Sequence, residues 1–219
     1  MPTQETMTPP RLPVMYTFRR CPYAMRARLA VDAVGCQVAW REVALSDKPA
    51  ALRLASPKAT VPVWIGVDGQ VIDESLAIML HLLAALDDPD LNPQGHARER
   101  ALAQIAECDG AFKYHLDRFK YHTRYPGEDP DVHRQALAEM LSEWDRQLAP
   151  RMSADIAAEL APGLADLAIL PFVRQCRIAD PAWFDAQPWP HVHRWLARFL
   201  LSAAFERVMV KRAVWQSGT

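Results

Sequence analysis

The stretch Arg19-Arg20-Cys21-Pro22-Tyr23-Ala24-Met25-Arg26 decides the fold of this chain. It follows a short apolar run, residues 14–18, that is typical of a buried strand, and it begins a segment from Pro22 to about Ala33 without a helix breaker. Proline suits the first turn of a helix, because its missing N–H would have no partner there in any case. Cys21 is therefore expected on a strand-to-helix turn, at the N-terminal end of the helix.

This position predicts a reactive sulfur. Free backbone N–H groups and the positive end of the helix dipole face Cys21, and Arg19, Arg20 and Arg26 add positive charge nearby. Each of these favours the thiolate, so we expect a pKa below the ordinary value of about 8.5 and a nucleophile at neutral pH. A lone cysteine is more often a small buried hydrophobe, and only its position on the turn and the flanking charges distinguish Cys21.

Composition indicates an ordinary globular protein. The 219 residues are 50% hydrophobic and 23% charged, and the formal net charge of -1 gives no general attraction to nucleic acid or anionic membranes. Cys21, Cys36, Cys108 and Cys176 lie far apart and form no C-x-x-C pair, which argues against a disulfide framework and a zinc site. The first residues lack signal-peptide features, and no apolar stretch reaches the roughly 18 residues that span a bilayer. We expect a cytoplasmic protein without metal.

Strand and helix signals alternate in the first part of the chain. Residues 36–45 predict a second strand after the first helix, and strand, helix and strand in this order form a βαβ unit with parallel strands. Two apolar runs flank Asp68-Gly69 and predict an antiparallel hairpin, and Ser75 is the expected N-cap of an apolar helix. Residues 13–86 should form an α/β domain with a four-stranded mixed sheet, after a flexible lead-in of residues 1–12.

Strand signals fade after residues 87–95, a polar, proline-containing stretch that suits a linker. Beyond it, apolar spacing predicts helices over residues 96–121, 132–148, 164–179, 191–203 and 205–214. Pro171 lies inside the most apolar of these helices and should bend or split it. Residues 96–219 should therefore form an all-helical domain.

Taken together and in order, these motifs resemble the glutathione transferase superfamily. They are Cys21-Pro22-Tyr23-Ala24 on the first helix, Val61-Pro62 before the third strand and Glu74-Ser75 at the third helix. A cysteine at the helix start is most similar to the omega-type, cysteine-dependent branch. The resemblance covers the chain from about Val14 onward. It implies a thioredoxin-like N-terminal domain, a helical-bundle C-terminal domain, glutathione as co-substrate and a homodimer.

The resemblance also implies a glutathione site. Pro62 matches a cis-proline whose preceding residue, Val61, pairs through its backbone with the cysteinyl part of glutathione. Glu74 and Ser75 match the pair that holds the γ-glutamyl end. Lys48 matches a lysine that faces the glycine carboxylate.

Each of these residues has an ordinary structural interpretation as well. Ser75 alone is an N-cap, Glu74 a first-turn acid and Lys48 a loop charge. Lys58 is an alternative partner for the glycine end, and Pro62 could be a trans residue at a strand edge. No single one of these residues supports the glutathione site; their joint occurrence does.

Ala24 indicates the mechanism. In dithiol relatives this position holds a second cysteine, whereas here a mixed disulfide on Cys21 needs an outside thiol, such as a second glutathione, to resolve it. The resemblance therefore implies glutathione-dependent thiol transfer, by deglutathionylation or by reduction of small oxidants. Conjugation to hydrophobic electrophiles, with Tyr16 or Tyr23 as activating hydroxyl, is an alternative, although Tyr23 fits the pocket wall better. A non-enzymatic, protein-binding member of the fold is another.

The second substrate, a small molecule or a disulfide, is expected in the cleft between the domains. The helix after the linker would line this cleft with aromatic and basic side chains. The candidate contacts are Lys113, Tyr114, Lys120 and Tyr121, whereas Phe112 and Leu116 have the spacing of core residues.

Overall fold

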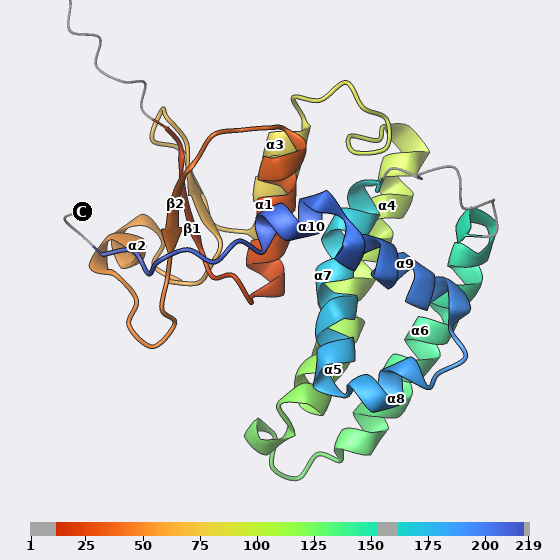
Figure 1. Ribbon diagram of the computed structural model, residues 1–219. Helices are drawn as coiled ribbons and strands as arrows, with labels where there is room; N and C mark the ends of the chain where they lie inside the picture. Colours follow the sequence, from red (N-terminus) through yellow and green to blue (C-terminus); the bar gives the residue numbers. More distant parts are fainter. Residues whose placement is uncertain (1–11, 153–161, 217–219) are drawn as a thin grey trace, which may run out of the picture.

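The computed structural model describes residues 12–152 and 162–216, and Figure 1 shows their arrangement. A small sheet with its helices lies on one side, and a group of longer helices lies on the other. All but the last residue of the predicted lead-in, residues 1–12, lies outside the described part of the chain.

The sheet has four strands in the order β2-β1-β3-β4. They are β1 (Val14–Thr17), β2 (Ala39–Glu42), β3 (Val63–Ile65) and β4 (Val71–Ile72). β1 is parallel to β2 and antiparallel to β3, which in turn is antiparallel to β4. The turn after β3 closes with a 2.8 Å bond from the Gly66 N–H to the Gln70 carbonyl, and Gly69 takes a φ of +87° that a side chain would disfavour. The predicted mixed sheet, with its βαβ unit and hairpin, is confirmed.

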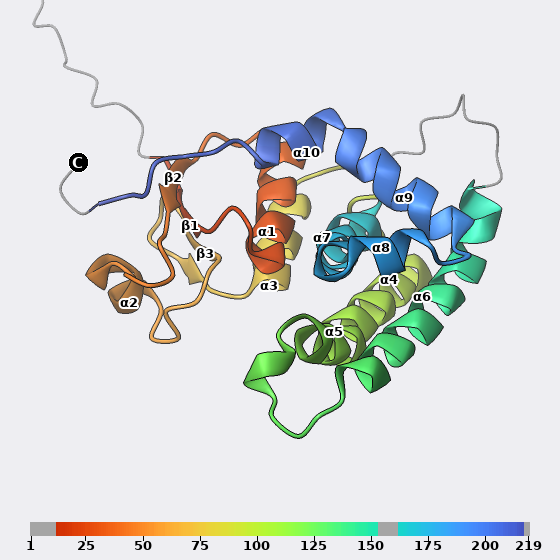
Figure 2. The same cartoon turned by 60° about the horizontal axis from the view of Figure 1, so that its bottom comes forward.

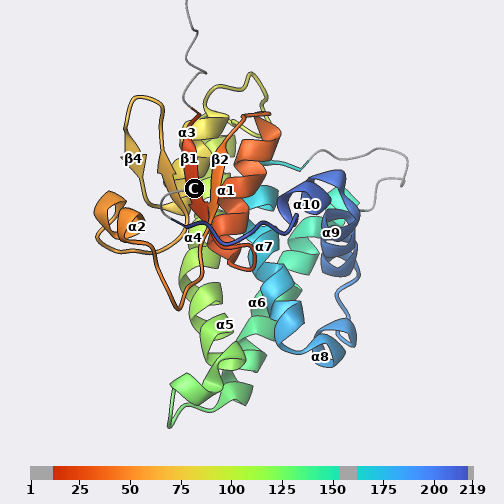
Figure 3. The ribbon, with the colours of Figure 1, turned by 60° about the vertical axis from the view of Figure 1, so that its left-hand side comes forward.

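Three helices belong to the sheet: α1 (Pro22–Ala33), α2 (Ala50–Ala55) and α3 (Ser75–Leu83). α1 and α3 pack against each other between the sheet and the longer helices (Figures 1 and 3). Because α1 has the sheet on one side and α7 on the other, residues 24–31 are all buried. The prediction of Ser75 as the N-cap of α3 is wrong: Glu74 takes that position, and the buried Ser75 hydroxyl accepts a hydrogen bond from Arg26 instead.

The second part of the chain is helical, as predicted. Its elements are α4 (Gly95–Glu107), a π-helical turn (Cys108–Phe112), α5 (Lys113–Lys120), a 3-10 turn (His122–Arg124), α6 (Pro130–Met152), α7 (Leu164–Ala179), α8 (Pro181–Asp185), α9 (Pro190–Leu201) and α10 (Ala203–Val208). α7 lies at the centre and packs against α1, α4, α5, α8 and α9 (Figure 2). None of the helices in the described ranges combines the length and apolarity needed to cross a bilayer.

Three helix predictions need correction. The predicted helix 96–121 is interrupted by the π-helical turn, and α7 is not split at Pro171 but continues through it as one helix. The predicted helix 205–214 ends at Val208. The chain after it, which we call the C-terminal tail (residues 209–216), is extended and runs back to β2, where the Trp215 N–H donates to the Glu42 carbonyl at 2.8 Å (Figures 1 and 3). As an edge strand, β2 offers unpaired backbone groups to such a segment.

A buried arginine joins the two halves of the molecule. The Arg26 side chain is fully buried, and its guanidinium donates to both carboxylate oxygens of Asp109 at 2.9 and 2.6 Å. It also donates to the Ala168 carbonyl at 3.1 Å and to the Ser75 hydroxyl at 3.3 Å, and it lies 4.8 Å from the centre of the Phe172 ring. Arg26 thus connects α1 and α3 with the π-helical turn and α7.

Asp109→Asn should lower the free energy of unfolding by about 3 kcal/mol, because it leaves the buried Arg26 guanidinium without its counterion. Asp185→Asn is the matched control, since it breaks a similar two-pronged pair with Arg177 in which both side chains are more than 40% exposed. That change should cost less than about 1 kcal/mol. Urea unfolding of both variants measures the difference, and equal losses would contradict the structural importance of the Arg26 contact.

Candidate functional site

Cys21 lies where the sequence predicts it, at the turn between β1 and α1. It is the N-cap of α1, and its N–H donates to the Phe18 carbonyl at 3.0 Å. The thiol is half-buried and points at the Val61 carbonyl, with 3.8 Å between sulfur and oxygen. The Val61-Pro62 peptide bond is cis, as the resemblance implied. The cysteine and the cis-proline turn therefore face each other across the end of the sheet.

The predicted shift of the Cys21 pKa is wrong in direction. Burial raises the pKa of the thiol above its ordinary value. Hydrogen bonding from the backbone of Ala24 and Tyr23, and the charges of Lys113 and Arg26, act in the opposite direction but do not outweigh burial. The helix start does stabilise the thiolate as expected, yet the surrounding chain withdraws the sulfur from water more than the sequence indicates.

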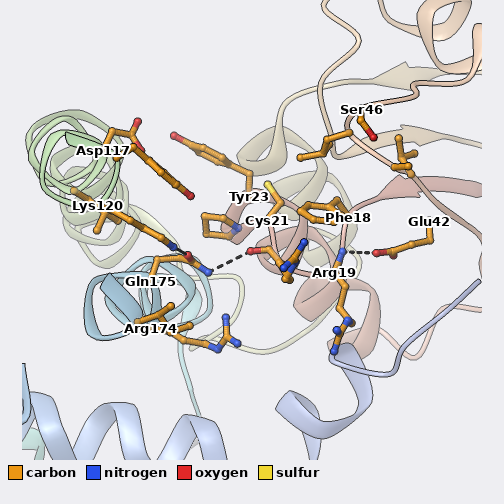
Figure 4. A pocket seen from close by; sticks show the side chains of 18 of the residues that line it. Phe18, Arg19, Cys21, Tyr23, Glu42, Ser46, Asp117, Lys120, Arg174 and Gln175 are labelled. Atoms are coloured by element: carbon orange, nitrogen blue, oxygen red, sulfur yellow. Dashed lines mark hydrogen bonds between the residues drawn. The ribbon is translucent and has the colours of Figure 1, made fainter. Parts of the chain in front are cut away.

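A cavity of about 1060 Å³ opens beside Cys21, between the sheet domain and the helices (Figure 4). The loop after β1, the loop after β2, α5, α7 and the C-terminal tail all contribute to its walls. Of the predicted site residues, it brings together Cys21, Tyr23, Lys113, Lys120 and Tyr121. A cysteine nucleophile, basic groups and aromatic walls thus share one cavity.

The predicted contacts to the γ-glutamyl end lie outside this lining. Ser75 is buried at the first turn of α3. Glu74 is exposed and pairs with Lys58, which also lies 3.5 Å from Asp73. Glu74 and Lys58, which were expected at opposite ends of one ligand, therefore neutralise each other in this structure.

Two other predicted residues also lie apart from the cavity. Lys48 is on the loop before α2, and its side chain is not part of the lining. Tyr114 is 47% exposed, and the Arg118 guanidinium lies 3.5 Å from the centre of its ring. The structure therefore groups Tyr114 with the surface of α5 rather than with Lys113 and Lys120.

The two tyrosines near the site are poorly placed to activate a thiol. Burial, and then the Asp109 charge, raise the pKa of Tyr23 to about 12. Tyr16 is buried in the sheet, outside the cavity, and its hydroxyl accepts a hydrogen bond from Arg41. This arrangement weighs against the conjugating alternative, in which a hydroxyl would hold glutathione as thiolate.

Several cavity residues were not predicted from the sequence. Gln175 on α7 donates to the Arg20 carbonyl at 3.2 Å and accepts from Lys120, so it connects three walls of the cavity. Arg174 from the same helix lines the cavity, as do Lys211 and Arg212 from the C-terminal tail. The only local signal was a polar pair, Arg174-Gln175, directly after the apolar run of residues 167–173.

Within the described ranges, no three His, Cys, Asp or Glu side chains are grouped as metal ligands.

Comparison with protein families identifies two domains. The glutathione S-transferase N-terminal domain matches residues 15–90, and the glutathione S-transferase C-terminal domain matches residues 95–198. The chain belongs to the glutathione transferase superfamily. A curated relative, a probable maleylacetoacetate isomerase of Caenorhabditis elegans, is 28% identical over 188 residues, which cover 83% of this chain and 86% of the relative.

Solved structures share the fold at low identity. A glutathione transferase family member from Pseudomonas fluorescens, with two glutathione bound, superimposes with a TM-score of 0.77 at 18% identity over 93% of this chain and 95% of that one. A Pseudomonas putida glutathione transferase with bound glutathione disulfide gives 0.76 at 20% identity, covering 93% of each chain. The Tau class enzyme of mango gives 0.76 at 21% identity over 91% of this chain and 93% of that one.

The raised pKa of Cys21 predicts how its alkylation depends on pH. Below that pKa the thiolate fraction, and hence the rate with iodoacetamide, should rise about tenfold per pH unit between about pH 7 and 9. Mass spectrometry of the Cys21 peptide separates this rate from that of Cys36, the other cysteine that is not fully buried. A rate that is flat over this range would show that the thiol is already ionised at neutral pH and would contradict the burial effect.

Proposed function

We propose that this protein is a glutathione-dependent thiol transferase that acts through a mixed disulfide between Cys21 and glutathione, as in the omega-type branch. The proposal rests on the position of the Cys21 sulfur, which faces the Val61 carbonyl beside the cis bond to Pro62 and opens into a large cavity. Relatives of the same fold that hold glutathione or its disulfide support glutathione as the co-substrate.

Glutathione would bind as an extended strand beside Val61, whose main-chain groups pair with the cysteinyl unit. This pairing would bring the glutathione sulfur to Cys21. The N-terminus of α3 with Ser75 would take the γ-glutamyl carboxylate, and Glu74 would exchange Lys58 for the glutathione ammonium. Lys48 would face the glycine carboxylate.

The reaction has two thiol-disulfide exchange steps. The Cys21 thiolate attacks the glutathione sulfur of a mixed disulfide R–S–S–G, the Cys21–glutathione disulfide forms, and R–S⁻ leaves and takes up a proton. The thiolate of a second glutathione then attacks the glutathione sulfur on Cys21, which yields glutathione disulfide and regenerates the cysteine. The contributions of Ala24, Tyr23 and Lys113, which lower the pKa, stabilise the thiolate in both steps.

A second candidate is glutathione-dependent isomerisation, favoured by the similarity to a probable maleylacetoacetate isomerase. In such a reaction the glutathione thiolate adds to a conjugated double bond and is expelled again after rotation, so no disulfide forms on Cys21. The two candidates therefore differ in whether the sulfur of Cys21 changes its oxidation state.

Cys21→Ser tests the mechanism directly. After incubation with glutathione disulfide, the wild-type protein should carry a glutathione adduct on the Cys21 peptide that free glutathione removes, because a thiolate exchanges with disulfides. Cys21→Ser should lose this adduct and at least about a hundredfold of the deglutathionylation rate, as expected when a covalent nucleophile is removed. Cys36→Ser is the control and should keep both. Full deglutathionylation by Cys21→Ser would overturn the proposal.

Ala24→Cys should convert the site from one thiol to two. Ala24 lies one helical turn after Cys21 and is fully buried, so a thiol there is placed to attack the mixed disulfide internally. After oxidation by glutathione disulfide, Ala24→Cys should hold an internal disulfide and little adduct, whereas the Ala24→Ser control should keep the adduct. Intact mass and thiol titration distinguish the two forms, and a stable adduct on Ala24→Cys would contradict the assigned role of position 24.

The homodimer and the cytoplasmic location stay part of this proposal. Light scattering of the purified protein measures the number of subunits. A monomer at working concentration would remove the homodimer from the proposal without affecting the chemistry at Cys21.

A further inference from the structure

The cavity beside Cys21 carries a large excess of positive charge. Eight of its lining side chains are cations and two are carboxylates, although the chain as a whole has a formal net charge of -1. The cations are Arg19, Arg20, Lys113, Lys120, Arg124, Arg174, Lys211 and Arg212, and the acids are Glu42 and Asp117. The excess therefore belongs to this cavity and not to the surface in general.

Most of these cations lack a counterion. Of these eight cations, only Lys113 forms an ion pair within the described part of the chain, and its partner is Asp117. The other acid, Glu42, accepts the backbone N–H of Arg19 at 2.6 Å and lies near Arg212 without forming a salt bridge. Charges that are partly withdrawn from water normally have a partner of opposite sign. In this cavity Arg19, Lys120 and Arg174 are half-buried cations without a carboxylate partner among the described residues, and an anionic ligand would supply one.

Arg174, Arg19 and Lys120 form the centre of this charge. Arg174 is half-buried and has no hydrogen-bond or ion-pair partner in the described part of the chain, apart from a ring contact with Phe205 at 5.4 Å. Burial and the charge of Arg19 lower the pKa of Arg174, and burial and the charge of Arg174 lower that of Lys120. Figure 4 shows Lys120 and Arg174 on one side of the cavity and Arg19 on the other. Arg174 thus repels both Arg19 and Lys120, and an anion between them would relieve that repulsion.

The C-terminal tail completes the positive wall. Trp215 pairs with β2 through its N–H and packs edge-on against Tyr16, with ring centres 5.8 Å apart. The Arg41 guanidinium lies 4.2 Å from the centre of one of the Trp215 rings. These contacts fix the tail against the sheet, so that Lys211 and Arg212 face the cavity.

We propose that the second substrate carries two or more negative charges, such as carboxylates or a sulfonate, and that Arg174, Arg19 and Lys120 bind them. This inference rests on the proposed thiol transfer for the reaction at Cys21. The substrate class is then the mixed disulfide of glutathione with a small acidic thiol. Phe18 and Tyr121 supply the apolar walls on which its carbon chain lies.

The cations are not needed to bind glutathione itself. Of the residues assigned to glutathione, only Tyr23 is part of the cavity lining, whereas Lys48, Val61, Pro62, Glu74 and Ser75 all lie outside it. The side chains of Arg174 and Lys120 come from α7 and α5, in the helical domain. The charges of Arg174 and Lys120 therefore lie on the side of Cys21 that receives the leaving thiol.

Four mixed disulfides of glutathione test the inference, because they differ mainly in the charge of the second thiol. They contain mercaptosuccinate (two carboxylates), 2-mercaptoethanesulfonate (one sulfonate), 2-mercaptoethanol (neutral) and cysteamine (one cation). Wild-type kcat/KM should be at least about tenfold higher for mercaptosuccinate than for mercaptoethanol and lowest for cysteamine, since one charge-assisted contact is worth about this factor. Added salt should reduce the difference.

Arg174→Gln should lower the ratio of kcat/KM for the mercaptosuccinate and mercaptoethanol disulfides by about tenfold. Arg177→Gln is the matched control. It removes the same charge from the same helix, but Arg177 lies outside the cavity and pairs with Asp185, so the ratio should not change. Lys211→Gln, at an exposed position on the tail, gives a second variant that leaves the packing of the helices intact.

Equal kcat/KM for all four disulfides would overturn this inference and leave thiol transfer standing. If the wild-type protein turns over none of them, the proposed function fails instead. Calorimetric titration of Cys21→Ser with the mercaptosuccinate and mercaptoethanol disulfides then decides the inference separately. Tighter binding of the acidic disulfide supports an anion site, and equal binding rules it out.

Discussion

The fold depends on the ion pair between Arg26 and Asp109. The Arg26 guanidinium is fully buried, and burying it without a counterion would cost free energy. Asp109 on the π-helical turn is that counterion, so this ion pair stabilises the packing of α1 against the helical domain. The Ala168 carbonyl and the Ser75 hydroxyl take further N–H groups of the same side chain. Because α1 begins at Cys21, this network also fixes the nucleophile relative to the helices that form the opposite wall of the cavity.

The sequence was sufficient for those parts of the fold that local residues determine. Pro22 marks the start of α1, and Asp68-Gly69 marks the turn between β3 and β4, where Gly69 adopts its positive φ. The resemblance correctly implied the cis bond at Pro62.

The rest could not be predicted, because it depends on contacts between distant parts of the chain. Gln175 reaches the Arg20 carbonyl across 155 positions, and the C-terminal tail returns to β2 as an extended segment rather than a helix. The residues next to each contact in the sequence show no pattern that would predict it. The direction of the Cys21 pKa shift was predicted wrongly for the same reason. The charges and N–H groups that lower this pKa can be recognised from the sequence, whereas the burial that raises it results from packing of the whole chain.

Charge balance at the sulfur connects the mechanism with the proposed substrate. Burial already raises the pKa of Cys21, and an acidic substrate would raise it further, because a negative charge nearby disfavours the thiolate. The charges of Lys113 and Arg26 oppose the effect of burial, and cavity cations that pair with the anionic groups of the substrate would cancel the second effect. Burial, and then the charge of a neighbouring cation, lower the pKa of Arg174 and of Lys120; the neighbour is Arg19 for Arg174 and Arg174 for Lys120, so both gain when an anion arrives. A neutral substrate would leave that repulsion in place. The same positive charge that selects an acidic thiol would therefore allow Cys21 to remain a nucleophile while such a substrate is bound.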